Sequence, residues 1–426
     1  MKLVATQARA RAAQPETTEA HTTKPKATAP KQSAPAKAAT RAAKPKAKAS
    51  TKARATTKAK PRARAAGRIA APRPAAKAEA QSPAQAAPAA PDRTPLRKDD
   101  LPKPLHTGKR LMGRVQLVLD EGQTTDVLGI CYGLEHEVSA PGYRVKLFLD
   151  YYNRRLKVMD YRAQDYGAMV AKLRFLADAN KFDKVWIKAD EKDWQHFLRY
   201  GYVLEGLLKY ANRGRTAYMM SRFCSQQRLH SRDLMQEILL IEEILGRGRR
   251  EGPRPLPAGY TLDFARERDV DGMLGLYRRV FKTYPSPLTY REYLTAVLHR
   301  DALFRVIRNK SGQVVSVASA EFDRPHLSAE LTDCATHPDE RGKGLMSVIL
   351  HALENDLRKH GYICAYTMAR ARSYGMNAAF HALGYEFNGR MINNCDIYGA
   401  FEDMNLWVKD LRPERVRGKK AKPARA

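Results

Sequence analysis

The spacing of apolar residues predicts alternating strands and helices over residues 111–245. Residues 165–179 show clear helical spacing, and Asp165 stands where the helix N-cap is expected. Runs of β-branched and aromatic residues on both sides of residues 153–154 predict a hairpin. The predicted elements of this part are strands at 146–150, 155–161, 184–188, 202–208 and 216–222 and helices at 165–179, 194–200 and 231–245.

A second series of strands and helices follows residues 246–257, whose Gly, Pro and Arg content is typical of a linker. Its predicted elements are strands at 260–264, 304–308, 314–322, 329–335, 363–369, 385–392 and 403–410 and helices at 269–281, 291–298, 346–360 and 377–383. The pattern predicts an α/β (α+β) fold with a mixed, mostly antiparallel sheet flanked by helices. The predicted parts are a tail (1–104), a first domain (105–245), the linker, a second domain (258–411) and a basic C-terminal tail (412–426).

One motif occurs in both domains. Phe197-x3-Gly201-Tyr202-x3-Gly206 in the first matches Phe380-x3-Gly384-Tyr385-x3-Gly389 in the second, each between a short helix and a closing strand. The match indicates either tandem copies of one fold or a recurrent way to join a helix to a strand. We favour tandem copies, the first degenerate, because the neighbouring elements agree in order.

The charge of the chain is concentrated in its tails. Of the net +31, residues 1–91 carry +17, since they contain 20 Lys and Arg and only three acidic residues. These residues also lack Phe, Trp and Tyr, so they cannot bury enough apolar surface to fold, and we expect a disordered tail. Its Lys-Pro-Lys-Ala repeats resemble linker-histone tails. Two interpretations stay open: non-specific binding of nucleic acid and a solubilising spacer.

The cellular compartment is predicted from what the chain lacks. No signal peptide is recognised at residues 1–4, and no run approaches the roughly 18 apolar residues of a membrane span. The five cysteines are scattered without a CxxC pair, which is typical of reduced thiols. We expect a cytoplasmic protein, with nucleoid association as the alternative that the basic tail adds, and no membrane or metal partner.

The clearest candidate chemistry is a glycine-containing loop between a strand and a helix. Arg341-Gly342-Lys343-Gly344-Leu345 follows the predicted strand at 329–335 and precedes the helix at 346–360. Glycines let the backbone approach a ligand closely, and a helix N-terminus presents unpaired N–H groups. Together they predict a binding site for a pyrophosphate.

These residues resemble the acetyl-CoA motif of the GNAT acetyltransferase superfamily, with Met346 where the motif prefers Gly or Ala. Further segments resemble the beta-lysine N-acetyltransferases, which make the compatible solute Nε-acetyl-beta-lysine. They are 280–285, 330–333, 365–371, 375–377, 393–394 and 402–407 of the second domain and 197–206 and 221–223 of the first. The resemblance implies acetyl-CoA as co-substrate. It places the binding of acetyl-CoA on Cys334, Ala335, Thr336, Arg341, Gly342, Lys343, Gly344, Leu345, Met346 and Asn377.

The acceptor amine, with a reference pKa of about 10.4, must lose a proton before it attacks the thioester. Glu330 aligns with the strand carboxylate that acts as base in histone-type members of the superfamily, and Asp333 is the second candidate. Strand alternation puts Glu330, Thr332 and Cys334 on one face and Asp333 on the other. The alternative is that one of the two carboxylates is structural. Cys334 is more simply explained as a buried thiol than as a nucleophile.

The resemblance assigns the remaining roles less completely. Phe380 stands where many members have a Tyr as general acid, so Tyr374 is the preferred substitute, although a thiolate of pKa about 8.5 can leave without an acid. The candidate substrate ligands are Asn393, Asn394 and Glu402, with a simple turn as the alternative for the Asn pair. The first domain lacks the loop, so we expect it to be structural or to complete the substrate cleft. A beta-lysine acetyltransferase is favoured over a protein-lysine acetyltransferase and over a nucleoid-associated protein.

Overall fold

The computed structural model describes residues 112–413 except 131, 251, 301 and 398. The predicted tail 1–104 and nearly all of the C-terminal tail lie outside the described residues, so their disorder and nucleic-acid binding stay predictions. Among the described residues, no helix is long and apolar enough to cross a membrane. In the same part of the chain, His, Cys, Asp and Glu side chains form no group of three that could hold a metal ion.

The N-terminal half contains every element that the apolar pattern predicts, and four more. Asp165 caps the first long helix as expected, because its side chain accepts a hydrogen bond from the N–H of Ala168. Strands β1, β2 and β3 and the single turn of α3 were not predicted. The elements are β1 (Met112–Asp120), β2 (Gln123–Ile130), β3 (Leu134–Ala140), β4 (Tyr143–Asp150), β5 (Arg155–Ala163), α1 (Tyr166–Ala179), β6 (Lys184–Asp190), α2 (Trp194–Leu198), β7 (Val203–Asn212), β8 (Arg215–Phe223), α3 (Gln226–Leu229) and α4 (Leu234–Leu245).

The C-terminal half also follows the predicted order of elements. Three bounds differ by three residues or more: α8 and β15 each begin three residues earlier than predicted, and β14 continues past residue 392 through an irregular stretch in which Asn393 has a φ of 44°. Its main elements are β9 (Thr261–Phe264), α5 (Val270–Val280), α6 (Arg291–Arg300), β10 (Ala302–Arg308), β11 (Val314–Asp323), β12 (Ser328–Thr336), α7 (Leu345–Lys359), β13 (Cys364–Arg370), α8 (Tyr374–Ala382), β14 (Glu386–Ile397) and β15 (Ala400–Asp410).

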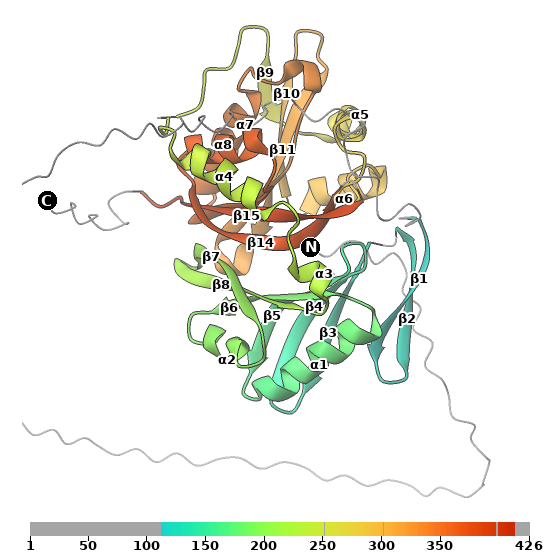
Figure 1. Cartoon of the computed structure of the whole chain (residues 1–426). Helices are drawn as coiled ribbons and strands as arrows, with labels where there is room; N and C mark the ends of the chain where they lie inside the picture. The colour runs from blue at the N-terminus through green and yellow to red at the C-terminus, as the bar shows by residue number, and fades with distance from the viewer. Residues whose placement is uncertain (1–111, 131, 251, 301, 398, 414–426) are drawn as a thin grey trace, which may run out of the picture. The chain divides into compact units, whose positions relative to one another are not determined.

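A single sheet of thirteen strands runs through both halves, in the order β3-β4-β5-β6-β8-β7-β14-β15-β13-β12-β11-β10-β9 (Figure 1). Apart from the additional edge strand β9 of the C-terminal half, each half read from its edge inward repeats the other: two antiparallel strands, a parallel pair, and a closing antiparallel pair. The register repeats as well. Corresponding strand pairs include Arg155–Lys184 with Ser328–Cys364 and Gly206–Met219 with Gly389–Leu406. Tandem copies of one fold are therefore confirmed, whereas the exact domain boundaries stay predictions.

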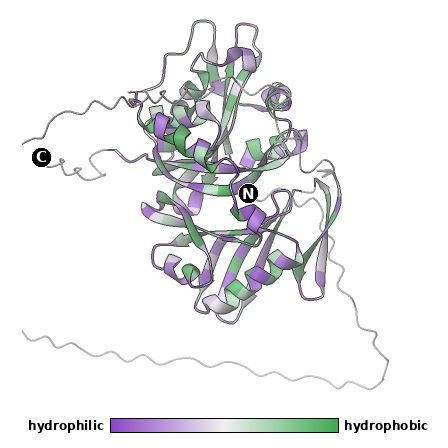
Figure 2. Ribbon diagram, in the orientation of Figure 1, coloured by the Kyte–Doolittle hydropathy of each residue, from purple (hydrophilic) through white to green (hydrophobic). Residues whose placement is uncertain are grey.

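Helices cover the sheet of each half, and apolar side chains fill the space between them. In the N-terminal half, α1 packs on β4, β5 and β6. In the C-terminal half, α7 packs on β10, β11 and β12, while α5 contacts β11 and β12 in a separate core that it shares with α6. Figure 2 shows apolar residues along the strands of both halves, interleaved with polar ones. This packing holds β12 rigidly between two helical layers, and β12 carries the candidate site.

Candidate active site

A cavity of about 1240 Å³ lies where the two halves face each other. The C-terminal half contributes residues of β11, β12, β13 and the loop before α7, and the N-terminal half contributes residues of β4, β5 and β6. The predicted residues that line it are Glu330, Asp333, Cys334, Thr336, Arg341, Gly342, Gly344, Leu345 and Met346. Most of the predicted acetyl-CoA loop and both candidate bases thus share one cavity with the first domain.

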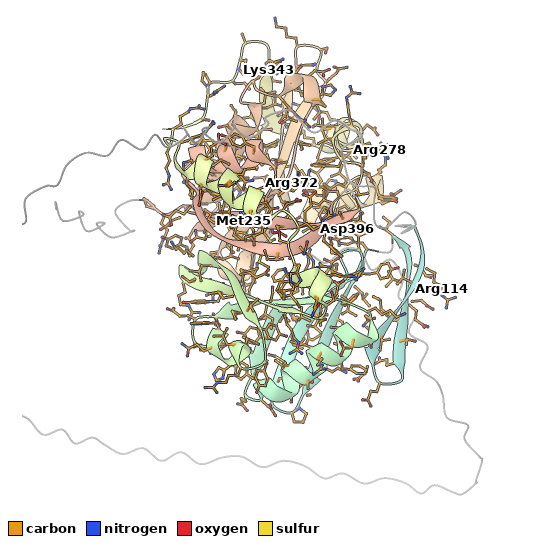
Figure 3. All side chains as sticks on the ribbon, in the orientation of Figure 1. Arg114, Met235, Arg278, Lys343, Arg372 and Asp396 are labelled. Carbon is orange, nitrogen blue, oxygen red and sulfur yellow. The ribbon has the colours of Figure 1, made fainter. Side chains whose placement is uncertain are left out.

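The loop before α7 has the geometry that binding a phosphate requires. Gly342 and Gly344 have φ angles of 80° and 79°, in the left-handed region that glycine tolerates best. Gly344 is the N-cap of α7 and offers no side chain, so the first N–H groups of this helix are left for another acceptor. The Lys343 side chain, labelled in Figure 3, does not line the cavity. Its Nζ instead donates to Glu340 Oε2 at 2.5 Å and to the hydroxyl of Tyr260. Any role of Lys343 in binding acetyl-CoA is limited to its backbone.

The cavity opens where β12 and β13 separate. These parallel strands pair only from Ser328 to Glu330 on β12, and Glu330 faces Tyr366 at the last pair. Beyond Glu330, the described residues form no further pairs between the two strands, so this edge of β12 faces the opening. Strand separation leaves the β12 backbone beyond Glu330 without a partner on β13 among the described residues.

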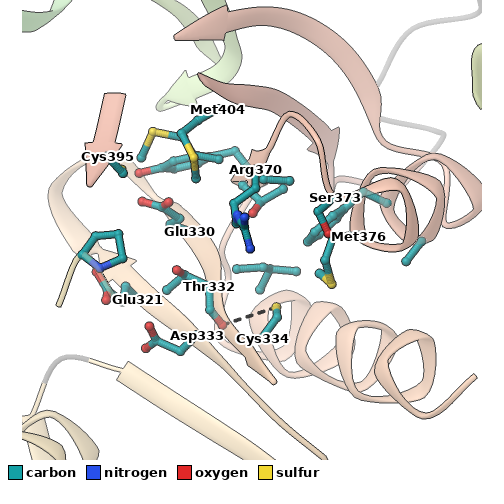
Figure 4. Close-up of a pocket in the computed structure, with 18 of the residues that line it drawn as sticks. Glu321, Glu330, Thr332, Asp333, Cys334, Arg370, Ser373, Met376, Cys395 and Met404 are labelled. Carbon is teal, nitrogen blue, oxygen red and sulfur yellow. Dashed lines mark hydrogen bonds between the residues drawn. The ribbon is translucent and has the colours of Figure 1, made fainter. Parts of the chain in front are cut away.

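A β-bulge in β12 changes the predicted direction of its side chains. The register of β12 against β11 shifts between the pairs Ser319–Thr332 and Val317–Ala335, and Asp333 has a φ of 54°. Ala335 therefore packs in the core under α5, while Cys334 packs toward α7. The prediction that Cys334 shares a face with Glu330, and that Asp333 lies on the other, is wrong. Figure 4 shows Asp333, Glu330 and Glu321 grouped together.

Glu330 has an ionisation suited to a general base. Burial first, and then the carboxylate of Glu321, its partner on β11, raise its pKa to about 7. The cations Lys188, Lys157 and Arg155 of the N-terminal half oppose this rise. Near neutral pH, Glu330 therefore exchanges between a carboxylate that accepts a proton and an acid that returns it.

Asp333 and Cys334 both have raised pKa values. Burial raises the pKa of Asp333 well above its usual range, and the nearby Glu321 raises it more. One oxygen of Asp333 accepts a hydrogen bond from Ser319 Oγ at 2.8 Å. Burial also raises the pKa of the Cys334 thiol, which donates to the carbonyl of Thr332, the dashed line in Figure 4. Burial thus disfavours the ionised form of both groups, whereas Glu330 has a pKa of about 7 and lies where β12 and β13 separate, so Glu330 is the base that the geometry supports best.

Tyr374 and Asn377 do not reach the cavity. The Tyr374 hydroxyl donates to Glu243 on α4 at 3.3 Å, so its predicted role as general acid lacks structural support. Asn377 is fully buried: its amide donates to the carbonyl of Arg370, and its oxygen accepts from Trp407 Nε1 at 2.8 Å. Asn377 anchors α8 to β13 and β15 rather than binding acetyl-CoA. The predicted Ala335 also lies outside the cavity lining.

The three predicted substrate ligands do not line the cavity, and their role as ligands stays a prediction. The Asn393 amide donates to the carbonyls of Arg228 and His230, which ties β14 to α3. The Asn394 carbonyl accepts from Arg155 Nη1 at 2.7 Å. Glu402 binds Arg370 through two hydrogen bonds of 2.6 Å, and only Arg370 of that pair lines the cavity. These contacts form because β14 joins the two halves.

Two groups of cavity residues were not recognised in the sequence. Arg247, Arg250 and Arg254 come from the predicted linker, and Arg254 Nη1 donates to the carbonyl of Gly342 at 3.4 Å. The second group is on the first domain and includes Lys157 and Lys188. The clustering of arginines at 246–257 was a visible signal for the first group. The second becomes apparent only when the two halves are superposed strand by strand.

Comparison with known proteins agrees with this geometry. The acetyltransferase (GNAT) family model matches residues 270–385. Beta-lysine N(6)-acetyltransferase of Methanosarcina mazei is 34% identical over 259 residues, which cover 56% of this chain and 95% of that protein. The corresponding enzyme of Methanococcus maripaludis is 30% identical, covering 60% of this chain and 93% of that protein.

A third relative, N-acetyltransferase YodP of Bacillus subtilis, is 31% identical over 277 residues, covering 64% of this chain and 98% of that protein. The three relatives are matched over nearly their whole length, so the likeness includes both halves of the sheet. The family model also covers β12 and the loop before α7, which carry the carboxylate and the glycines that line the cavity. This chain therefore belongs to the GNAT family of acetyltransferases, with the beta-lysine N(6)-acetyltransferases among its relatives, and is an acetyl-CoA-dependent N-acetyltransferase.

Proposed function

We propose that the enzyme transfers the acetyl group of acetyl-CoA to the side-chain amine of beta-lysine or a similar diamino acid, giving Nε-acetyl-beta-lysine as a compatible solute. The names of two relatives, which are matched over 93% and 95% of their length, support this acceptor. The size of the cavity supports it too, since about 1240 Å³ holds both a coenzyme arm and a small acceptor.

The observation that carries the proposal is the position of Glu330. Its carboxylate lines the cavity at the point where β12 and β13 separate, and its pKa is about 7. Glu330 takes a proton from the acceptor ammonium, directly or through one water, and the free amine then attacks the thioester carbon. Backbone N–H groups of β12 beyond Glu330 stabilise the negative charge that develops on the carbonyl oxygen. The carbon–sulfur bond then breaks, and coenzyme A leaves as a thiolate that takes up the proton lost by the attacking nitrogen.

The charges around Glu330 support an acceptor with an ammonium group. Glu321 and Asp333 lie beside Glu330 on neighbouring strand positions. Two of these three carboxyl groups have raised pKa values because they are buried near one another. A bound cation relieves this repulsion, so the acceptor binds most tightly as an ammonium ion and is deprotonated in place.

A steady-state assay tests the acceptor. Acetyl-CoA is offered with beta-lysine, alpha-lysine, spermidine and a panel of lysine-containing peptides. The proposal predicts the highest kcat/KM for beta-lysine. Transfer to the peptides with none to the free diamino acids would instead identify a protein-lysine acetyltransferase. The compatible-solute role predicts that a host supplied with beta-lysine accumulates the acetylated product under salt stress only when it expresses the active enzyme.

The charge of the tail supports one further property, non-specific association with nucleic acid in the cytoplasm or at the nucleoid. Residues 1–91 carry +17, and such a segment releases counterions when it neutralises phosphates. Retention of the full chain on DNA should then fall steeply between low and moderate salt. Deletion of residues 1–91 should abolish retention while leaving acetyl transfer unchanged, whereas equal retention of both proteins would leave the tail as a spacer.

A further inference from the structure

Lys157 in the N-terminal half occupies the position that Glu330 occupies in the C-terminal half. In the strand register, Lys157 lies between Phe148 on β4 and Trp186 on β6. Glu330 lies in the same way on β12, the strand that corresponds to β5, between Glu321 on β11 and Tyr366 on β13. Both residues line the one cavity. The degenerate copy therefore presents a cation to the cavity where the catalytic copy presents its base.

Two neighbouring cations on this wall already have strong partners. Arg155 Nε donates to Asp150 at 2.7 Å, and its Nη1 donates to the carbonyl of Asn394. Lys188 Nζ donates to the Tyr366 hydroxyl at 3.0 Å. These contacts, with the Asp323 carboxylate 3.6 Å from Lys188 Nζ, hold both side chains in place.

Lys157 is less well paired. Its nearest carboxylate oxygen among the described residues is Asp150 Oδ2 at 3.6 Å, beyond a normal hydrogen bond. That same oxygen already accepts from Arg155, so one carboxylate serves two cations. Its Nζ also lies 5.2 Å from the Phe148 ring centre and 6.0 Å from that of Trp186, and the carboxyl group of Glu330 adds a weaker attraction. A buried ammonium with so little compensation is costly to the free enzyme.

The surroundings of Lys157 thus favour an anion from the cavity. Burial and the charge of Arg155 lower the pKa of Lys157, and a bound carboxylate would reverse both effects. The same cavity presents the carboxyl group of Glu330, which favours a cation. A substrate that carries an amine at one end and a carboxylate at the other meets this description.

We infer that Lys157 binds the carboxylate of the acceptor, so that the first domain selects amino acids over polyamines and simple amines. This inference rests on the proposed function, because it assumes that a diamino acid is the acceptor. It gives the copy without an acetyl-CoA loop a direct part in substrate recognition: Lys157 holds the acid end while the amine end lies at Glu330.

The test compares acceptors with and without a carboxylate. The wild-type enzyme should favour beta-lysine over beta-lysinamide, and 6-aminohexanoate over hexylamine, by about 10- to 100-fold in kcat/KM, the range of a hydrogen bond to a charged group. Lys157→Met should lower kcat/KM for beta-lysine by about the same factor and leave the amide within about threefold. Lys157→Arg should recover part of the preference. Lys146→Met is the matched control, since Lys146 is exposed on β4 and does not line the cavity.

Each outcome decides the inference. An unchanged ratio of acid to amide in Lys157→Met, or an equal loss on both acceptors, would overturn it. The wild-type comparison needs no variant, so a folding defect in Lys157→Met cannot hide a negative result. Transfer to spermidine or peptides with none to beta-lysine would refute the proposed acceptor, whereas transfer to beta-lysine without any carboxylate preference would refute only the role of Lys157.

Discussion

Gly206 and Gly389 lie directly opposite each other where β7 meets β14, and theirs is the strand pair that joins the two halves of the sheet. The two residues are equivalent in the repeated motif, so each copy supplies its glycine to the contact. A Cβ atom built on Gly389 would lie 2.4 Å from both the Glu205 carbonyl oxygen and the Cα of Gly206. The absence of a side chain at both positions is what lets the two backbones approach.

We predict that Gly389→Ala destabilises the protein by about 2–4 kcal/mol, because the added methyl group meets backbone atoms and the φ of 143° is strained for alanine. Chemical denaturation measures the free energy of unfolding. Gly275→Ala is the control, since Gly275 lies in α5 with no atom within 4 Å of a built Cβ; it should be neutral or stabilise by up to about 1 kcal/mol. Equal stability of Gly389→Ala and the wild type would contradict the close approach of the halves.

Cys334 should not carry the acetyl group. Its thiol is protonated at neutral pH because burial raises its pKa, so it is a poor nucleophile. We predict that Cys334→Ala keeps kcat within about threefold of the wild type. Mass spectrometry of the wild type mixed with acetyl-CoA alone should find no acetyl adduct on Cys334. An adduct that disappears when acceptor is added would instead establish a covalent intermediate.

The linker arginines should contribute to the binding of acetyl-CoA. Arg254 lines the cavity beside Gly342 and Gly344, where a diphosphate would sit, and the site is exposed enough for salt to screen it. We predict that Arg254→Ala raises the KM for acetyl-CoA by about 3- to 10-fold at low salt with little change in kcat, and that the difference shrinks as salt increases. Arg249→Ala, from the same segment but outside the cavity lining, should behave like the wild type. Equal KM values for both variants would remove Arg254 from the site.

The order of elements could be predicted from local signals in the sequence. The helix α1 is an example, since its apolar period and the Asp165 cap are both local features. The strand β3 was missed because its segment, Leu134–Ala140, mixes polar and apolar residues, and the strand forms by pairing with β4. Pairing of this kind depends on a partner that a local pattern does not identify.

The candidate site could be predicted only where its chemistry is local. The loop Arg341-Gly342-Lys343-Gly344-Leu345 has its function in the backbone, so its glycines identify it. The bulge at Asp333 could not be predicted, because strict alternation is the only rule available for a strand. Asn377 is a polar residue in a family-like segment, yet its side-chain amide satisfies a buried backbone carbonyl that only the folded protein brings next to it.

The pH dependence of acetyl transfer to beta-lysine, in the wild type and in Glu330→Gln, tests the central claim most directly. Glu330 must be deprotonated to accept a proton, so wild-type kcat/KM should fall as pH decreases through about 7. Glu330→Gln should be about 10²- to 10⁴-fold slower, should lack this limb, and should have an optimum shifted upward, since only acceptor already free of its proton can react.

Glu386→Gln, which removes a carboxylate that pairs with Lys209 outside the cavity, is the control and should keep the wild-type profile. Melting temperatures of both variants should match that of the wild type, so that a difference in rate comes from the chemical step and not from unfolding. A Glu330→Gln enzyme with the wild-type rate and the same fall in activity near pH 7 would contradict the account.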